Sequence, residues 1–259
     1  MNGVRLAVRQ LRFENKAFWR NPAAAFFTFI FPLLFLFIFT TLLGNETITL
    51  PSGKEVKAST YYTASILAFA VVTACYTNIA MAVTFLRDEG VLKRVRGTPL
   101  PPWSYLLGRI FHAVCIMALL VVIVCTFGWL VYDISLPTTS APAFLATLLV
   151  GAFTFCALGL ACTAIVPNAD AAPAVVNGTV LPLLFLSGVF IPIDDAPAWV
   201  RTFANIFPVR PFLEAVIDGF LPSASNSAGW RPGALAIVAA WGIGALLVAS
   251  RWFRWESRR

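Results

Sequence analysis

Long apolar runs separated by short polar segments set the pattern of this sequence of 259 residues. Six of the runs reach the roughly 20 apolar residues that a helix needs to cross the hydrocarbon layer of a membrane. The predicted spans are residues 22–43, 61–85, 105–131, 142–166, 173–192 and 232–250. The pattern therefore predicts an all-α membrane protein with six transmembrane helices.

The first 21 residues follow the pattern of an amphipathic helix. Apolar side chains such as Leu11 and Phe18 gather on one side of this helix, and basic side chains recur every three or four positions on the other. The basic residues are Arg5, Arg9, Arg12, Lys16 and Arg20. We expect a helix in the cytoplasmic membrane interface, with its apolar side down, followed by one six-helix membrane domain at residues 22–259.

The segment between the fifth and sixth predicted spans, residues 193–231, is apolar but too often interrupted to cross a membrane. The interruptions are Pro197, Pro208, Pro211 and Pro222. Non-helical backbone at membrane depth is tolerated only inside protein or beside water. We therefore expect two short extracellular helices, lying on the outer leaflet or re-entering it. Glu214 is predicted to lie on a solvated face of the second helix, or else to serve a gate or a substrate amine.

Composition agrees with a membrane protein and argues against several other classes. Only 12% of the residues are charged, against about a quarter in soluble domains. The one His and five Cys have no metal-binding spacing, and every Cys lies in an apolar run, so no metal site is predicted. The basic residues cluster at membrane edges, which favours orientation and contact with anionic membrane lipid over nucleic-acid binding.

The basic residues also predict the direction of the spans. Five Lys or Arg lie in the N-terminal segment, five between residues 87 and 109, and four in the C-terminal tail, so fourteen of the nineteen share one side. Because positive charge is retained on the cytoplasmic side of a membrane, both termini and the loop after the second span are predicted to be cytoplasmic.

Catalytic motifs are missing from the sequence. It has no nucleophile elbow, no HExxH motif and no GxxxxGK[ST] loop to cradle ATP. No catalytic residue is therefore predicted, and active transport would draw its energy from an ion gradient or another chain. Ion-coupled carriers place ionisable residues at mid-membrane, whereas these spans offer little besides His112, so a separate ATPase is favoured. A lone His close to Arg109, with no carboxylate near it, favours a structural role over a proton relay.

Small and hydroxylated side chains form a stripe along the second predicted span. Its members are Ser65, Thr73, Tyr76, Thr77, Ala80 and Thr84. Such a stripe is typical of close helix packing, but it also suits a substrate path, because polar groups in a membrane need an inward-facing position. The fourth span carries small residues at helix-packing spacing: Ala152, Cys156, Gly159 and Thr163.

The densest charged segment in the first half of the chain, residues 85–100, lies between the second and third spans. Residues 90–96 supply about two helical turns, with Val91, Leu92 and Val95 on one side. Proline disfavours helix in the residue before it, so Pro99 is expected to end this helix. A short helix of this kind suits docking into a groove on a soluble partner. The alternative is a basic loop that only fixes topology.

Three motifs, in chain order, resemble the permease subunits of ABC type-2 exporters. Residues 87–100, RDEGVLKRVRGTPL, resemble the family's cytoplasmic loop after the second span, R-E-E-G-T-L-x-R-L-x-x-T-P-L. Residues 186–192, LSGVFIP, with the later Pro197-Ala198-Trp199, resemble the end of the fifth span and its outer turn. Residues 205–216, NIFPVRPFLEAV, are similar to N-P-L-T-x-x-x-E-A-L, although Phe207 separates the Asn–Pro pair and Arg210 departs from the pattern.

The resemblance implies an exporter powered by a separate subunit. The N-terminal helix would be a connecting helix and the loop after the second span a coupling helix. Both would dock on a cytoplasmic ABC ATPase that binds ATP and Mg²⁺, and no cofactor is expected on this chain. The implied coupling residues are Arg87, Asp88, Glu89, Gly90, Leu92, Lys93, Arg94, Thr98 and Pro99.

The resemblance also implies that two such units, identical copies or paralogous permeases, build one pathway lined by the second and fifth spans. The implied pathway residues are Phe69, Thr73, Tyr76, Thr77 and Asn177. The chain is similar to the daunorubicin and multidrug resistance permeases of the bacterial plasma membrane, so export of an amphipathic drug-like or lipid-like compound by alternating access is expected. An ion-gradient-driven carrier and a non-transporting membrane scaffold are the alternatives.

Overall fold

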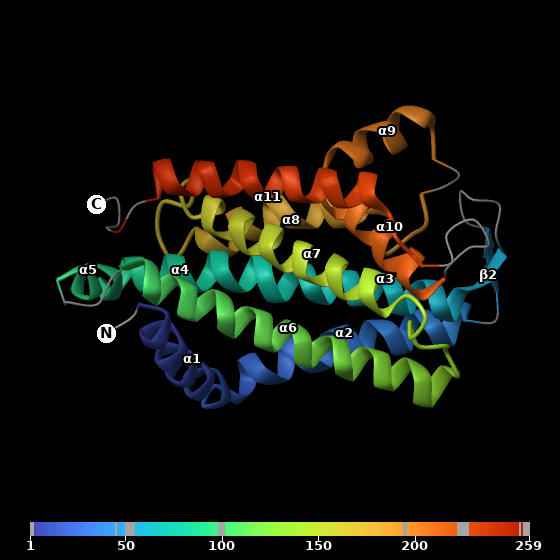
Figure 1. The fold of residues 1–259 in the computed structure, drawn as a ribbon, viewed down its shortest axis with the longest axis horizontal. Coiled ribbons are helices and arrows are strands. Elements are labelled where there is room, and N and C mark those ends of the chain that lie inside the picture. The colour runs from blue at the N-terminus through green and yellow to red at the C-terminus, as the bar shows by residue number, and fades with distance from the viewer. Residues whose placement is uncertain are drawn as a thin grey trace.

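The computed structural model of the chain describes residues 3–44, 46–49, 55–97, 102–193, 196–221, 228–253 and 255. Apart from one small hairpin, the elements in these ranges are helices, and most run side by side in an elongated bundle (Figure 1). The helices are α1 Gly3–Trp19, α2 Pro22–Leu43, α3 Ala58–Val72, η1 Thr73–Thr77, α4 Asn78–Asp88, α5 Val91–Arg96, α6 Pro102–Tyr132, α7 Ala141–Cys162, α8 Ala172–Ser187, α9 Ala198–Ile206, α10 Val209–Phe220 and α11 Pro232–Trp252. The predicted all-α class is confirmed.

The two chain ends lie at the same end of the bundle, together with α5, and the hairpin lies at the opposite end (Figure 1). We call these the α5 end and the hairpin end. The hairpin strands, β1 Thr47–Thr49 and β2 Glu55–Lys57, pair antiparallel with Thr47 opposite Lys57. They fall between the first and second predicted spans, where the sequence pattern gave no prediction of strands.

Among the described residues, five helical segments are long and apolar enough to cross a membrane: α2, Ala58–Asp88, Trp103–Tyr132, α7 and α11. The predicted fifth span corresponds to α8, which has only 16 residues, or about 24 Å of helix against a hydrocarbon layer of about 30 Å. It ends before the predicted boundary because Gly188 adopts a left-handed conformation, φ 88°, which terminates the helix. The number of crossings stays a prediction.

The second predicted span lies at the centre of the bundle. It runs without interruption from Ala58 to Asp88 through α3, η1 and α4, and it contacts α2, α6, α7, α8 and α10. Every residue of α3 is buried. Of the predicted polar stripe, Ser65 and Thr84 are fully enclosed by the protomer itself, so these two positions serve helix packing in this structure.

Small residues allow α7 to pack closely against its neighbours. A Cβ added at Gly242 of α11 would lie 2.7 Å from Thr154 Oγ1 on α7, and one added at Gly159 would lie 2.8 Å from the Tyr76 carbonyl oxygen. The Thr154 hydroxyl donates to the Val238 carbonyl oxygen at 2.9 Å. The small residues predicted on the fourth span, Ala152, Cys156, Gly159 and Thr163, are all buried, as helix packing requires.

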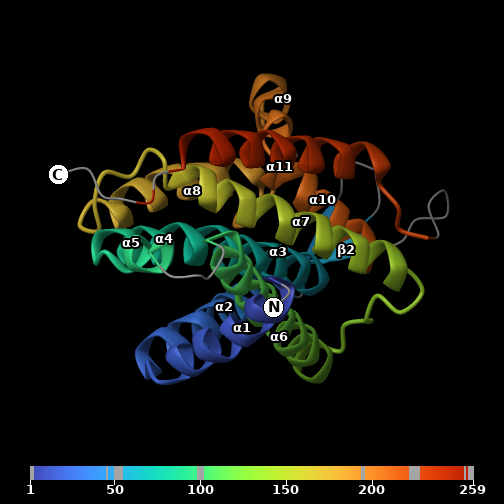
Figure 2. The same cartoon turned by 60° about the vertical axis from the view of Figure 1, so that its left-hand side comes forward.

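Two short helices do follow α8, as predicted, but they differ in burial. α9 projects from the bundle in both views (Figure 1, Figure 2) and exposes Trp199. In contrast, α10 is buried along most of its length. The expectation that Glu214 lies on a solvated face is wrong: its side chain is 18% exposed, and its carboxylate pairs with Arg210 at 2.8 Å and Arg231 at 3.2 Å. The paired cations satisfy a carboxylate that would otherwise be costly to bury.

Candidate functional site

The chain changes direction where the second span ends, in residues 87–96, which we call the elbow. Helix α4 ends at Asp88, and Gly90 then adopts a left-handed conformation with φ 72° before α5 begins. Glycine reaches this conformation without the steric cost that a Cβ would impose. The result is a short helix set at the tip of the α5 end (Figure 1).

The elbow has an inner and an outer side. Leu92 is completely buried, and Val95 packs against the core. Glu89, Lys93 and Arg94 are exposed. This division follows the predicted apolar and charged sides of the short helix. Of the other predicted coupling residues, Thr98 and Pro99 lie outside the described residues.

Arg87 belongs to the interior, although the family resemblance implied that it is one of the residues that dock a partner. It is 3% exposed, and its guanidinium donates to the carbonyl oxygens of Thr163 at 2.7 Å and Val166 at 2.5 Å. These carbonyls belong to the C-cap of α7 and to the turn that follows it, so Arg87 fixes the turn where the chain leaves α7. Next to it, the Asp88 carboxylate accepts from the Ala169 amide at 3.0 Å.

These bonds are the first of three levels at which the second span is joined to α8 or to the turn before it. In the middle, the Tyr76 and Thr179 hydroxyls are 2.5 Å apart. At the hairpin end, the Tyr61 hydroxyl donates to the Gly188 carbonyl oxygen at 2.7 Å. The second span and α8 are therefore coupled along the length of the bundle.

At the α5 end, an ion pair also joins α1 to the bundle. Helix α1 packs against α6, and Glu14 pairs with Arg109 at 3.0 Å, with both side chains largely buried. The same carboxylate interacts electrostatically with His112, which packs edge-on against the Phe18 ring. Glu14 thus contributes to the electrostatic surroundings of His112 from another helix, which the sequence around His112 did not indicate.

Comparison with known proteins assigns most of this chain to a family. Residues 8–221 match the model of the ABC-2 type transporter family. The chain belongs to this family. It is 24% identical over 152 residues to the "Probable multidrug ABC transporter permease YbhR" of Escherichia coli K12, and 26% identical over 225 residues to the "Putative transport permease ycf38" of Pyropia yezoensis.

The two relatives differ in how much of each chain is matched. The YbhR match covers 59% of this chain but only 41% of YbhR, so the chain spans less than half of that relative. The ycf38 match covers 86% of this chain and 75% of the relative. The predicted resemblance to ABC type-2 permeases is confirmed. A place in the daunorubicin group within the ABC-2 family stays a prediction, and family membership agrees with a transport subunit that is not itself an enzyme.

The ABC-2 chain keeps most of the predicted pathway residues inside the protomer. Phe69 is 5% exposed, and the Thr73 hydroxyl donates to the Phe69 carbonyl oxygen at 3.0 Å. Tyr76 is bound to Thr179, and Thr77 is half-buried. Asn177 lies apart from them, on an exposed face of α8. The structure thus gathers the second-span residues and leaves Asn177 on the surface.

A π-helical turn, η1, lies in the middle of the second span at Thr73–Thr77. It contains three of the predicted pathway residues. A π turn inserts an extra residue into a helix and rotates the faces before and after it, and such turns occur frequently at functional sites. No sequence signal pointed to it, because the apolar pattern of the span does not distinguish α from π geometry.

Proposed function

We propose that this chain is the permease subunit of an ATP-driven ABC-2 exporter that extrudes an amphipathic, drug-like or lipid-like compound. A separate cytoplasmic ABC ATPase would supply the ATP and Mg²⁺ sites. The observation that carries the proposal is the elbow, which exposes Glu89 and Arg94 while its buried side is fastened to the bundle through Leu92 and Arg87. The printed name of YbhR supports a drug-like substrate.

The elbow is suited to transmit movement from a partner. A closing ATPase would push on the exposed side of α5, and the push would reach the second span directly. Through Arg87 and Asp88 it would also reach the turn before α8. Because the second span and α8 are joined again at Tyr76 and Tyr61, both would move as one body. This is the motion that alternating access requires.

The proposal also covers the orientation of the chain in the membrane and the second permease of the transporter. The α5 end would face the cytoplasm of a bacterial cell, with both termini there, and α8 with the turn after it would complete six crossings of the plasma membrane. A second permease, identical or paralogous, would cover the exposed face of α8. That face carries Asn177, and a polar side chain is costly beside lipid but suits a shared pathway.

The coupling test reverses exposed charges on the elbow. Glu89→Lys and Arg94→Glu should each weaken co-purification with the ATPase by about tenfold, equivalent to about 1.4 kcal/mol of binding free energy, and lower export to the same degree. Glu55→Lys is the control, since Glu55 is also exposed but lies on the hairpin strand β2. If co-purification and export survive both reversals, the elbow is not the coupling element.

The energy source of transport distinguishes the proposed exporter from the alternative functions. Export in vesicles that is blocked by vanadate and insensitive to an uncoupler supports the ATPase-driven mechanism. The opposite result supports an ion-gradient-driven carrier. A scaffold would show no substrate-stimulated ATPase activity in the purified complex.

A further inference from the structure

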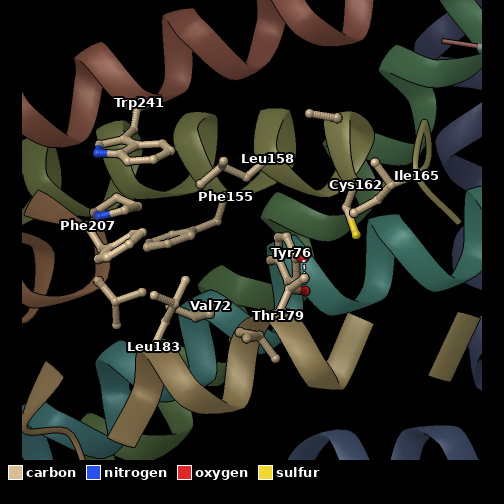
Figure 3. Close-up of a pocket in the computed structure, with 14 residues that line it drawn as sticks. Val72, Tyr76, Phe155, Leu158, Cys162, Ile165, Thr179, Leu183, Phe207 and Trp241 are labelled. Carbon is tan, nitrogen blue, oxygen red and sulfur yellow. Dashed lines mark hydrogen bonds between the residues drawn. The ribbon is translucent and has the colours of Figure 1, made fainter. Parts of the chain in front are cut away.

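An apolar cavity lies beside the middle of the second span, between α7, α8 and α11 (Figure 3). Its volume is about 260 Å³. The lining residues come from separate elements and include Val72, Tyr76, Phe155, Cys162, Leu183 and Trp241. Among the described residues that line it, none is charged, so the site is built for an uncharged, apolar occupant.

The few polar groups at the cavity are already bonded within the protein. The Tyr76 hydroxyl lies 2.5 Å from the Thr179 hydroxyl, and the Trp241 indole donates to the Ile206 carbonyl oxygen at 2.7 Å. The Trp241 ring also stacks on Phe207, with ring centroids 5.8 Å apart. These groups therefore offer a ligand no free hydrogen-bond partner. Apolar cavities of this kind stay dry and bind apolar molecules.

The cavity continues toward the surface. A second, more open hollow of about 500 Å³ shares Leu158, Ala161 and Trp241 with it. The remaining residues of this hollow lie on α11 and include Ala240, Gly244 and Val248, which are exposed. Trp241 is near the middle of α11, so the opening lies at mid-depth of a membrane-spanning helix. Hydrocarbon chains, and no headgroups, are present at that depth.

We propose that this cavity binds one acyl chain of a membrane phospholipid, inserted sideways between α8 and α11. Its volume is below the roughly 300–1,000 Å³ of pockets that bury drug-sized ligands, which suits a single slender chain. The absence of a charged lining residue and the mid-membrane opening exclude the headgroup as the bound part. The proposal does not depend on the ATPase partner, since its site lies away from the elbow.

The test uses the full-length protein in nanodiscs that contain phosphatidylglycerol with a photoactivatable group. One probe carries the group at the middle of the acyl chain, and a second carries it next to the headgroup. After irradiation, peptide mapping should find mid-chain adducts concentrated on cavity residues of α7, α8 and α11. The headgroup probe should leave those residues unlabelled. Both probes act on the unmodified protein, so the result does not depend on the folding of a variant.

A matched pair of variants tests the cavity itself. Leu158→Trp on α7 fills the space, and mid-chain adducts there should fall by about tenfold, because a filled cavity leaves no room for the chain. Leu149→Trp, on the same helix at a position that is 63% exposed, should leave them unchanged. Adduct levels no higher at the cavity than on the exposed face of α2 would overturn the proposal. If the adducts disappear when two copies of the chain associate, the second copy covers the opening and a lipid chain does not enter there. This result would also overturn the proposal.

Discussion

Single side chains hold the α5 end together, and Arg87 is the one with the largest expected effect. Its guanidinium satisfies two carbonyl oxygens, those of Thr163 and Val166, in the turn that follows α7. A charge-assisted hydrogen bond to a buried carbonyl is stronger than a neutral one. Removal of the donor would leave both carbonyls buried and without this partner.

We therefore predict that Arg87→Gln lowers the free energy of unfolding by about 1–3 kcal/mol. Arg87→Lys should recover only part of the loss, because an ammonium does not reproduce the planar fork of the guanidinium. Arg12→Gln is the control, since Arg12 is exposed on α1 and should change stability by less than about 0.5 kcal/mol. Thermal unfolding in detergent measures all three. Equal melting temperatures for Arg87→Gln and the control would contradict the assignment.

Glu214 is the second residue with a defined effect. It neutralises Arg210, whose side chain is only 6% exposed, and it also pairs with Arg231. Glu214→Gln would leave the Arg210 charge in a buried site with weaker compensation. The expected loss of stability is about 3 kcal/mol.

Asp218→Asn provides the matched comparison on the same helix. Asp218 is 31% exposed and pairs with Arg231, itself 42% exposed, at 3.4 Å. Exposed ion pairs contribute about 0–1 kcal/mol, so this variant should unfold close to the wild-type temperature. A larger loss for Asp218→Asn than for Glu214→Gln would show that the buried Arg210 charge does not depend on Glu214.

At the scale of elements, close packing of α7 against α11 stabilises the bundle. A Cβ at Gly242 would approach Thr154 Oγ1 to 2.7 Å, whereas a Cβ at Gly244, on the opposite side of the same helix, meets nothing within 4 Å. Gly242→Ala should destabilise the protein by about 1–3 kcal/mol through overpacking. Gly244→Ala should be neutral or stabilise slightly, because alanine favours helix over glycine. Melting temperatures of the two variants in the opposite order would disprove this packing argument.

Elements were predictable where a local pattern determines them. In lipid every backbone polar group needs an internal partner, so a long apolar run becomes a helix, and α2 begins and ends as predicted, at Pro22 and Leu43. The elbow could also be foreseen, because Gly90 and the apolar side of α5 are local features. The early end of α8 at Gly188 and the π turn at Thr73–Thr77 depend on surroundings that a single stretch does not reveal.

Long-range partners account for the other differences. In the sequence, nothing distinguishes Arg87 from the other basic residues of its charged segment. Its carbonyl partners lie in a turn that is distant in the sequence. Glu14 reaches Arg109 only because α1 folds back along α6. Glu214 shares a helical face with Asp218 and so resembles a solvated position, yet it pairs with Arg210 and Arg231. Local periodicity encodes which residues are helical and does not encode which helices meet.

At the scale of the whole molecule, the prediction with the largest consequence is that the short α8 crosses the membrane. The turn before α8 lies at the α5 end, and α9, beyond its other end, lies toward the hairpin end (Figure 1). If α8 with the buried residues that follow it crosses, Asp170 and Thr202 lie on opposite sides of the membrane. Retention of positive charge on the cytoplasmic side then places Asp170 inside and Thr202 outside.

Single cysteines test this prediction in a variant whose five native Cys are replaced. In intact cells, an impermeant maleimide should label Thr202→Cys on α9 and Glu55→Cys on the hairpin, since both positions are exposed. Asp170→Cys, which is also exposed, should react only after the membrane is opened. Labelling of Asp170→Cys and Thr202→Cys from the same side would mean that α8 does not cross. That result would contradict the structure, in which both chain ends lie at the α5 end (Figure 1), and the charge bias that places both basic termini on the cytoplasmic side.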